Sequence, residues 1–202
     1  MIEHIIFDFG DVLINLDKPG LKKSLLEIGI SQKHPKLQEL NETFEVGGIS
    51  EQDFLKGLQE LSNSASIPEV RSAWNSILGD FPPERLEFLQ ELKKTHKLYL
   101  LSNTDAIHIQ HFEHRHGENF TKAFYGCFEK IYFSFEHKIR KPNPEIYQKV
   151  LNDHHMSPKG TLFVDDKKDN ILAAEACGIL TWLLQPEIED VTELFKLKYF
   201  NS

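Results

Sequence analysis

The stretch Ile5-Ile6-Phe7-Asp8-Phe9-Gly10-Asp11 decides the fold of this 202-residue chain. Its short apolar run is typical of a buried β-strand, because a strand inside a parallel sheet is covered on both faces. The run ends at Asp8, and the following residues indicate a turn. A carboxylate therefore stands at the end of a buried strand, where open parallel sheets bind their ligands.

The same arrangement, an apolar run followed by polar residues, recurs further along the chain. Leu98-Tyr99-Leu100-Leu101 precedes Ser102, and Leu162-Phe163-Val164 precedes Asp165-Asp166. Between them a basic residue, Lys141, stands before a proline. Because the carboxyl ends of parallel strands meet at one edge of a sheet, these groups and Asp8 can converge on one crevice. Together they predict a site for a phosphate and a metal ion.

Strand and helix patterns alternate over most of the chain. We predict strands and helices in the following ranges: strands at 3–8, 97–102, 130–134, 160–165 and 179–184, and helices at 84–94, 105–116, 143–154 and 168–177. This alternation indicates βαβ units. The predicted fold class is α/β, a Rossmann-like parallel sheet with helices on both faces. Residues 187–200 are expected to form a short amphipathic helix and tail.

Residues 20–83 differ from the rest, because helical patterns follow one another there without a strand between them. Apolar side chains recur at helical spacing in groups around Leu25, Phe44, Phe54 and Trp74. Pro82-Pro83 ends this segment, since a proline pair cannot continue a helix. We predict a helical-bundle cap inserted into a core, with these boundaries: cap 16–83, core 1–15 and 84–202.

Composition limits the possible partners and the location of the protein. Hydrophobic residues make up 40% and charged residues 27%, an ordinary balance, and no apolar run approaches the ~18 residues that cross a membrane. The net charge of -8 argues against a nucleic-acid partner, because phosphate backbones require a basic surface. Cys127 and Cys177 lack zinc-ligand spacing, and the chain shows no signal-peptide pattern. We therefore expect a cytoplasmic protein with reduced thiols.

The acidic residues at the strand ends suit phosphoryl transfer. Asp8 is a candidate nucleophile, because a carboxylate attacks phosphorus well when a divalent cation offsets the repulsion between two anions. Asp165 and Asp166 offer the hard oxygen ligands that Mg²⁺ prefers, and their mutual repulsion favours binding of a cation. Asn170 can hold these carboxylates from behind. Taken alone, each carboxylate could equally be a solvated residue of a turn.

The remaining candidates are Ser102, Asn103 and Lys141. Ser102 and Asn103 stand before a predicted helix and offer a hydroxyl and backbone N–H groups to a phosphate. They are equally good helix N-caps, and the two roles are compatible. The Lys141 ammonium would neutralise both the Asp8 carboxylate and the phosphoryl oxygens. The neighbouring Arg140 and Lys138 are interpreted as surface charges.

The order Asp8, Ser102, Lys141 and Asp165-Asp166 resembles the haloacid dehalogenase-like (HAD) hydrolase superfamily. The predicted helical insertion lies between the first two motifs, as in the members with a small helical cap. The sequence of segments such as Leu101-Ser102-Asn103-Thr104 resembles that of bacterial phosphatases that act on α-D-glucose 1-phosphate. The resemblance covers the whole chain.

This resemblance implies a Mg²⁺-dependent phosphomonoester hydrolase that acts on a small phosphorylated metabolite, such as a sugar phosphate, through an aspartyl-phosphate on Asp8. It implies that the metal is held by Asp8, the Gly10 carbonyl, Asp165 and Asp166. It implies that the phosphoryl oxygens are bound by Ser102, Asn103 and Lys141. The cap, with the Gly47-Gly48 turn facing the substrate, would close over the leaving group.

Gly10 departs from the family pattern, in which most phosphatases carry a second Asp there as the general acid. Glycine cannot donate a proton, and such help is worth roughly 10²–10⁴-fold. We therefore expect weaker activity on simple alkyl phosphates than on sugar 1-phosphates. Gly10 also leaves open a catalytically weak protein that only binds a phosphorylated ligand or partner. A 2-haloacid dehalogenase is disfavoured by Asp165-Asp166, since the resemblance implies that dehalogenases need no metal.

Overall fold

A parallel sheet forms the centre of the structure, a computed structural model that describes residues 2–200. It is built from β1 (His4–Phe7), β2 (Lys97–Ser102), β3 (Lys130–Phe133), β4 (Thr161–Asp165) and β5 (Leu180–Leu183), in the order β3-β2-β1-β4-β5. All neighbouring strands are parallel. Phe7 pairs with Leu100 and with Val164, so the central strands end together at one edge. The predicted sheet is confirmed.

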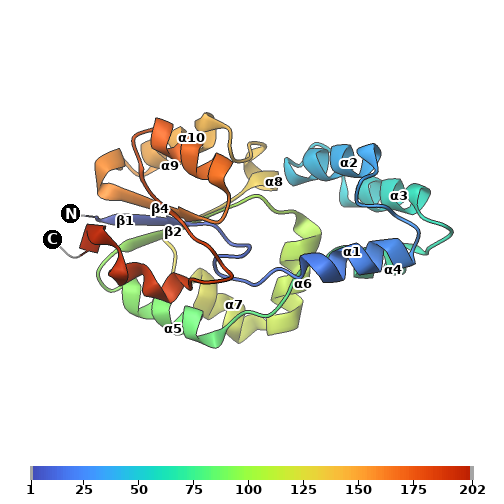
Figure 1. The fold of residues 1–202 in the computed structure, drawn as a ribbon, viewed down its shortest axis with the longest axis horizontal. Helices are drawn as coiled ribbons and strands as arrows, with labels where there is room; N and C mark the ends of the chain where they lie inside the picture. The colour runs from blue at the N-terminus through green and yellow to red at the C-terminus, as the bar shows by residue number, and fades with distance from the viewer. Residues whose placement is uncertain (1, 201–202) are drawn as a thin grey trace.

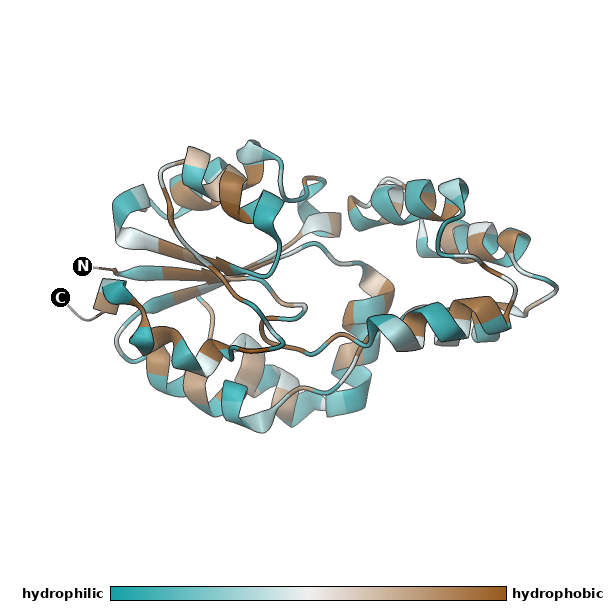
Figure 2. Cartoon of the chain, in the orientation of Figure 1, coloured by the Kyte–Doolittle hydropathy of each residue, from teal (hydrophilic) through white to brown (hydrophobic). Residues whose placement is uncertain are grey.

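Helices cover both faces of the sheet, because successive residues of each buried strand point to opposite sides. Ile5 and Phe7 pack into one apolar cluster, and Ile6 packs into another. In Figure 1, α9 (Pro144–Asp153) and α10 (Lys168–Ala176) lie on one side of the sheet, and α5 (Pro83–Leu92) and α7 (Glu118–Tyr125) lie on the other. Figure 2 shows apolar colouring on the strands between these helices.

The structure differs from the sequence prediction in three places, one of which is the unpredicted short helix α8 (Ser134–His137). Helix α7 was not predicted; it follows α6 (Ala106–His116) directly through Gly117, whose φ of 79° ends one helix and admits the next. The helix predicted within 187–200 is wrong, because the chain forms two 3₁₀ segments there, Val191–Lys196 and Lys198–Phe200. The buried Val191 and Leu194 are three residues apart, which is the 3₁₀ period.

Four helices are inserted between β1 and α5: α1 (Lys18–Glu27), α2 (Pro35–Glu45), α3 (Glu51–Leu61) and α4 (Ile67–Asn75). These inserted helices project from one end of the sheet (Figure 1) and share an apolar cluster of their own. Phe44 of α2 stacks on Phe54 of α3 with ring centroids 4.3 Å apart. Within residues 2–200, no helix combines the length and apolar character that a membrane crossing requires.

The two chain segments that lead into and out of the inserted helices run side by side. Leu16 and Leu78 form an antiparallel bridge, and the Gly79 N–H donates to the Asn15 carbonyl at 2.9 Å. Ile107 of α6 belongs to the apolar cluster of the inserted helices. The inserted helices therefore rest on α6, directly beside the edge where the strands end.

Candidate active site

Lys141 joins two strand ends in the interior of the protein. Its Nζ lies 2.7 Å from Asp8 Oδ1 and 2.7 Å from Asp165 Oδ2, although these residues are far apart in the sequence. The Lys141 side chain is 1% exposed and that of Asp165 is 0% exposed. Asp8 directly follows β1, where its N–H donates to the Val164 carbonyl. The strand ends thus bring together the groups that the sequence placed there.

Asp165 uses both carboxylate oxygens within the protein. Its Oδ1 accepts the Lys167 N–H at 2.7 Å, and Oδ2 is paired with Lys141. The Asn170 side-chain amide lies 3.0 Å and 2.9 Å from the two oxygens. Asn170 therefore holds Asp165 from behind, and Asp165 in turn holds Lys141.

Asp166 differs from its neighbour, because its Oδ1 is buried without a hydrogen-bond partner among the described residues. Burial raises the pKa of Asp166, and the neighbouring Asp165 charge raises it further. Asp8, Asp165 and Asp166 each bring one oxygen within 4.8 Å of the others. A group of hard oxygen donors with one unpaired buried atom fits a small divalent cation.

The charges around Asp8 also favour binding of a cation. Burial raises the pKa of Asp8 to about 7, even though the Lys141 ammonium counteracts this shift. For Lys141, burial alone would lower the pKa, but the Asp165 and Asp8 carboxylates raise it above its usual range. Lys141 therefore stays protonated at neutral pH, and one buried cation serves two carboxylates. A further positive charge would stabilise the ionised form of Asp8.

Asn103 and Ser102 have different surroundings. Asn103 donates through Nδ2 to the Lys141 carbonyl and accepts the Lys141 N–H on Oδ1, both at 2.8 Å. Its side chain therefore fixes the Lys141 backbone and is already occupied. Ser102 is buried at the end of β2 and lines a cavity. The N-cap of α6 is Asp105, whose side chain accepts the His108 N–H.

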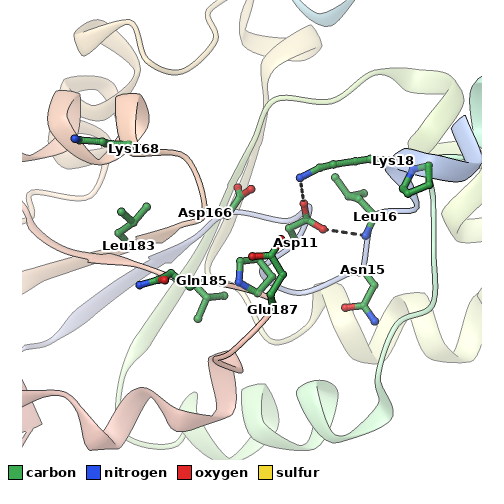
Figure 3. A pocket seen from close by; sticks show the side chains of 12 residues that line it. Asp11, Asn15, Leu16, Lys18, Asp166, Lys168, Leu183, Gln185 and Glu187 are labelled. Atoms are coloured by element: carbon green, nitrogen blue, oxygen red, sulfur yellow. Dashed lines mark hydrogen bonds and ion pairs between the residues drawn. The ribbon is translucent and has the colours of Figure 1, made fainter. Parts of the chain in front are cut away.

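Gly10 and Asp11 form the turn after Asp8. A Cβ at Gly10 would lie 2.8 Å from Leu16 Cδ1, so a side chain there would require Leu16 to move. Asp11 has a left-handed φ of 58°, and its carboxylate faces α1: Oδ1 accepts the Leu16 N–H at 3.0 Å, and Oδ2 lies 2.5 Å from Lys18 Nζ. Figure 3 shows these contacts beside Asp166. Asp11 therefore stabilises the segment that leads into the inserted helices.

A cavity of about 200 Å³ lies between the strand ends and the inserted helices. Polar groups from both sides line it: Gly10, Ser102, Asn103, Thr104, His108 and Lys167 from the sheet side, and Asn41 and Glu45 from the inserted helices. A more open cavity of about 920 Å³ is lined by Asp166 together with Asp11 and Lys18 (Figure 3). The strand ends are thus enclosed on one side and open to solvent on the other.

The sequence predicts Arg140 to be a surface charge, but in the structure it contacts α2. Its guanidinium lies 3.1 Å from Glu45 Oε2 and 3.6 Å from Glu42 Oε1, so it connects the Lys141 loop to α2. Sequence reasoning also missed Glu45, which is only 15% exposed in its side chain. Lys138, by contrast, is exposed as expected.

Comparison with known proteins identifies the family. Residues 2–178 match the family model of the haloacid dehalogenase-like hydrolases, and the chain belongs to that family. D-ribitol-5-phosphate phosphatase of Bacteroides thetaiotaomicron is 29% identical over 193 residues, 93% of each chain. The sesquiterpene phosphatase of Aspergillus oryzae is 28% identical over 198 residues, 95% of this chain and 94% of that protein.

A solved structure agrees with the sequence matches. A HAD family enzyme from Bacteroides thetaiotaomicron, in complex with magnesium and inorganic phosphate, superimposes with a TM-score of 0.86 and 33% identity. The match covers 96% of this chain and 100% of that chain. This protein is therefore an enzyme of the HAD-like hydrolase family, and the relatives named above are phosphatases.

Proposed function

We propose that this protein is a Mg²⁺-dependent phosphomonoester hydrolase that acts on a small phosphorylated sugar or polyol. One observation carries the proposal: buried Lys141 holds Asp8 and Asp165 at 2.7 Å each, beside the unpaired oxygen of Asp166. In an ion-pair network that only stabilises the fold, each carboxylate oxygen usually has a partner. A cluster that leaves one buried carboxylate oxygen without a partner is instead suited to binding a metal ion and a phosphate.

The donor set fits magnesium. Asp8, Asp166 and the backbone carbonyl of Gly10 would hold the ion. When bound, it would offset the negative charge that builds up between the carboxylate and the phosphoryl group. Asp165 was assigned to the metal with the other carboxylates; because its oxygens already accept hydrogen bonds from Lys141, Lys167 and Asn170, we propose that it positions Lys141 instead.

Asp8 would act as the nucleophile. Its carboxylate oxygen attacks phosphorus, the bond to the leaving alcohol breaks, and an aspartyl-phosphate remains until water releases phosphate. Lys141, already 2.7 Å from Asp8, would neutralise the charge on the phosphoryl oxygens without moving. Ser102 and backbone N–H groups at the start of α6 would bind those oxygens, and the Asn103 side chain would keep Lys141 in place.

The lining of the enclosed cavity suggests the substrate class. Its volume of about 200 Å³ suits a small metabolite. Asn41 donates to Glu45 and Arg140 pairs with Glu45, and a hydroxylated leaving group would add hydrogen bonds to this polar set, whereas a hydrocarbon group would not. This favours a sugar or polyol phosphate, as acted on by one named relative, over a terpenoid phosphate, as acted on by the other.

Phosphate release provides the test. With Mg²⁺, the protein should hydrolyse p-nitrophenyl phosphate and members of a panel of sugar and polyol phosphates, and chelation with EDTA should remove the activity. Asp8→Asn should lower kcat by about 10³-fold or more, because an amide is a poor nucleophile and a poor metal ligand. Asp80→Asn, which changes an exposed carboxylate, is the matched control.

Two results would contradict the proposal. Activity that survives Asp8→Asn would exclude an aspartyl-phosphate on this residue. Absence of phosphate release from every ester, with retained binding of inorganic phosphate, would favour the alternative that the protein only binds a phosphorylated ligand. Chloride release from a 2-haloacid in the presence of EDTA would instead indicate a dehalogenase.

A further inference from the structure

The proposed reaction needs a proton donor, and position 10 does not provide one. When the P–O bond breaks, an alkoxide leaves, and its departure requires a proton unless the alcohol is unusually acidic. Gly10 has no side chain, and Leu16 occupies the space next to it. Asp11 lines the more open cavity rather than the enclosed one, and its carboxylate is bonded to the Leu16 N–H and to Lys18. The donor must therefore come from elsewhere in the cavity.

His108 lines the cavity but has no proton to spare. Its Nδ1 lies 2.9 Å from Asp105 Oδ2, and its Nε2 lies 3.2 Å from the Trp74 carbonyl oxygen. Because both ring nitrogens face acceptors, both are occupied as donors. The Trp74 Nε1–H also donates to Asp105 at 3.0 Å. This cluster links α4 to α6 and leaves the ring fixed.

Glu45 remains as the carboxylic group that the inserted helices contribute to the cavity lining. It stands at the end of α2, and its side chain is 15% exposed. The Asn41 amide donates to its Oε1 at 3.3 Å, and Arg140 lies 3.1 Å from its Oε2. These contacts orient the carboxyl group in a cavity that also contains Gly10 and Ser102.

We propose that Glu45 is the general acid of this enzyme and replaces the carboxylate missing at position 10. The proposal rests on the proposed function. Asp8 attacks phosphorus, the electron pair of the breaking P–O bond passes to the leaving oxygen, and that oxygen takes the Glu45 proton. In the second half, water attacks the aspartyl-phosphate, gives a proton back to Glu45, and the released electron pair restores the Asp8 carboxylate.

The charges around Glu45 are compatible with this role. Burial raises its pKa, while Arg140 and Lys167 act in the opposite direction and Asp105 adds to the rise. His108 also faces this group, and Glu42 is its charged neighbour on α2. A glutamic acid whose pKa is raised by burial is suited to proton transfer near neutral pH. With Glu45 as donor, alkyl phosphates do not require an acid at position 10.

A comparison of leaving groups tests the role of Glu45. Glu45→Gln keeps the size of the side chain and removes the proton. It should lower kcat/KM for D-ribitol 5-phosphate by about 10²–10⁴-fold and leave kcat/KM for p-nitrophenyl phosphate within about threefold, because that leaving group needs no proton. Because kcat/KM reports only the steps up to P–O cleavage, it is not affected by the later hydrolysis of the aspartyl-phosphate. In the unmodified protein, kcat/KM for D-ribitol 5-phosphate should fall at high pH as Glu45 loses its proton. This fall should disappear in Glu45→Gln.

Glu42→Gln is the matched control, since Glu42 also pairs with Arg140 but does not line the cavity. It should behave as the unmodified protein does with both esters. Glu45→Asp, which keeps an acid, should restore part of the alkyl activity together with the fall at high pH. Equal loss on both esters in Glu45→Gln, or no loss on either, would overturn the role of Glu45. Inactivity of the unmodified protein on both esters would instead overturn the proposed function.

Discussion

The sheet side of the candidate site and the side formed by the inserted helices are held in different ways. On the sheet side, the contacts that join Lys141, Asp165 and Asn170 span 2.7–3.0 Å and are buried. On the helix side, Glu45 is held by contacts of 3.1 and 3.3 Å from Arg140 and Asn41. The first side is a closed network of charges, and the second is a looser set of polar groups.

This difference separates two tasks. Stabilising a transferring phosphoryl group requires charges that are already in place, because reorganisation during the reaction would raise the barrier. Contacting a leaving group requires side chains that fit one particular alcohol. The rigid strand ends suit the first task, and residues on an inserted segment suit the second. Mutations on the two sides should therefore have different consequences.

On the sheet side, Lys141→Met should have a large effect on both activity and stability. This change leaves two buried carboxylates, Asp8 and Asp165, without their cation. We expect kcat/KM for p-nitrophenyl phosphate to fall by about 10²–10³-fold, the range for loss of one electrostatic stabiliser. In EDTA, the free energy of unfolding in urea should fall by about 3–5 kcal/mol, the usual cost of breaking a buried ion pair. Lys159→Met, at an exposed lysine, is the control; similar losses there would contradict the expectation.

The junction between the two sides gives the next largest effect. Asp105, 1% exposed, accepts hydrogen bonds from Trp74 of α4 and pairs with His108 of α6. Asp105→Asn should lower the free energy of unfolding by about 2–4 kcal/mol, because a buried charge pair and a hydrogen bond to a carboxylate are lost. Asp80→Asn removes the exposed pair with Arg115 and should cost less than about 1 kcal/mol. Urea denaturation measures both, and equal costs would show that this junction is not special.

Much of the sheet side could be predicted from the sequence. Each short apolar run makes a strand, and the polar residue that follows it must stand at the strand end. The register that pairs Phe7 with Leu100 and Val164 then places Asp8 and Asp165 next to each other. What the sequence did not reveal is that Asp165 is saturated and Asp166 is not, because that depends on backbone N–H groups and on Asn170.

The helix side was less predictable for a physical reason. In α2 the apolar residues Leu37 and Phe44 mark the buried face, and Glu45 next to Phe44 has the pattern of a surface charge. Glu45 is buried because Arg140, in a loop more than ninety residues later in the sequence, packs against it. A signal was present for α7, since Phe120 and Phe124 stand one helical turn apart after Gly117. The position of an inserted helix over a sheet edge has no comparable local signature.

A smaller effect concerns the pH dependence of the same junction. Burial alone would lower the pKa of His108, but Asp105 outweighs it and the pKa lies above its ordinary value of 6.5. This contribution to stability is complete below pH 6.5 and is lost as the pH rises through the folded pKa. Burial alone would raise the pKa of Asp105, but His108 and the hydrogen bonds hold it below 3.8, so its contribution is lost as the pH falls through that lower value.

The two shifts define a window. The difference in free energy of unfolding between the unmodified protein and Asp105→Asn should be largest between pH 3.8 and 6.5 and should shrink on both sides. Urea denaturation at several pH values measures it. A difference that stays constant from pH 4 to 9 would show that the two residues are not linked as an ion pair in the folded state.

The smallest effect is expected from Arg140→Gln on the helix side. The guanidinium lowers the pKa of Glu45, so its removal should raise that pKa and move the fall in kcat/KM at high pH to higher pH. The activity at the optimum should change by only a few fold, because the charges of the sheet side remain. Arg71→Gln, which breaks an ion pair with Glu51 on the outer helices, is the control and should not move the profile. A profile that does not move in Arg140→Gln would mean that the group titrating there is not Glu45, and that the looser side of the site does not carry the proton.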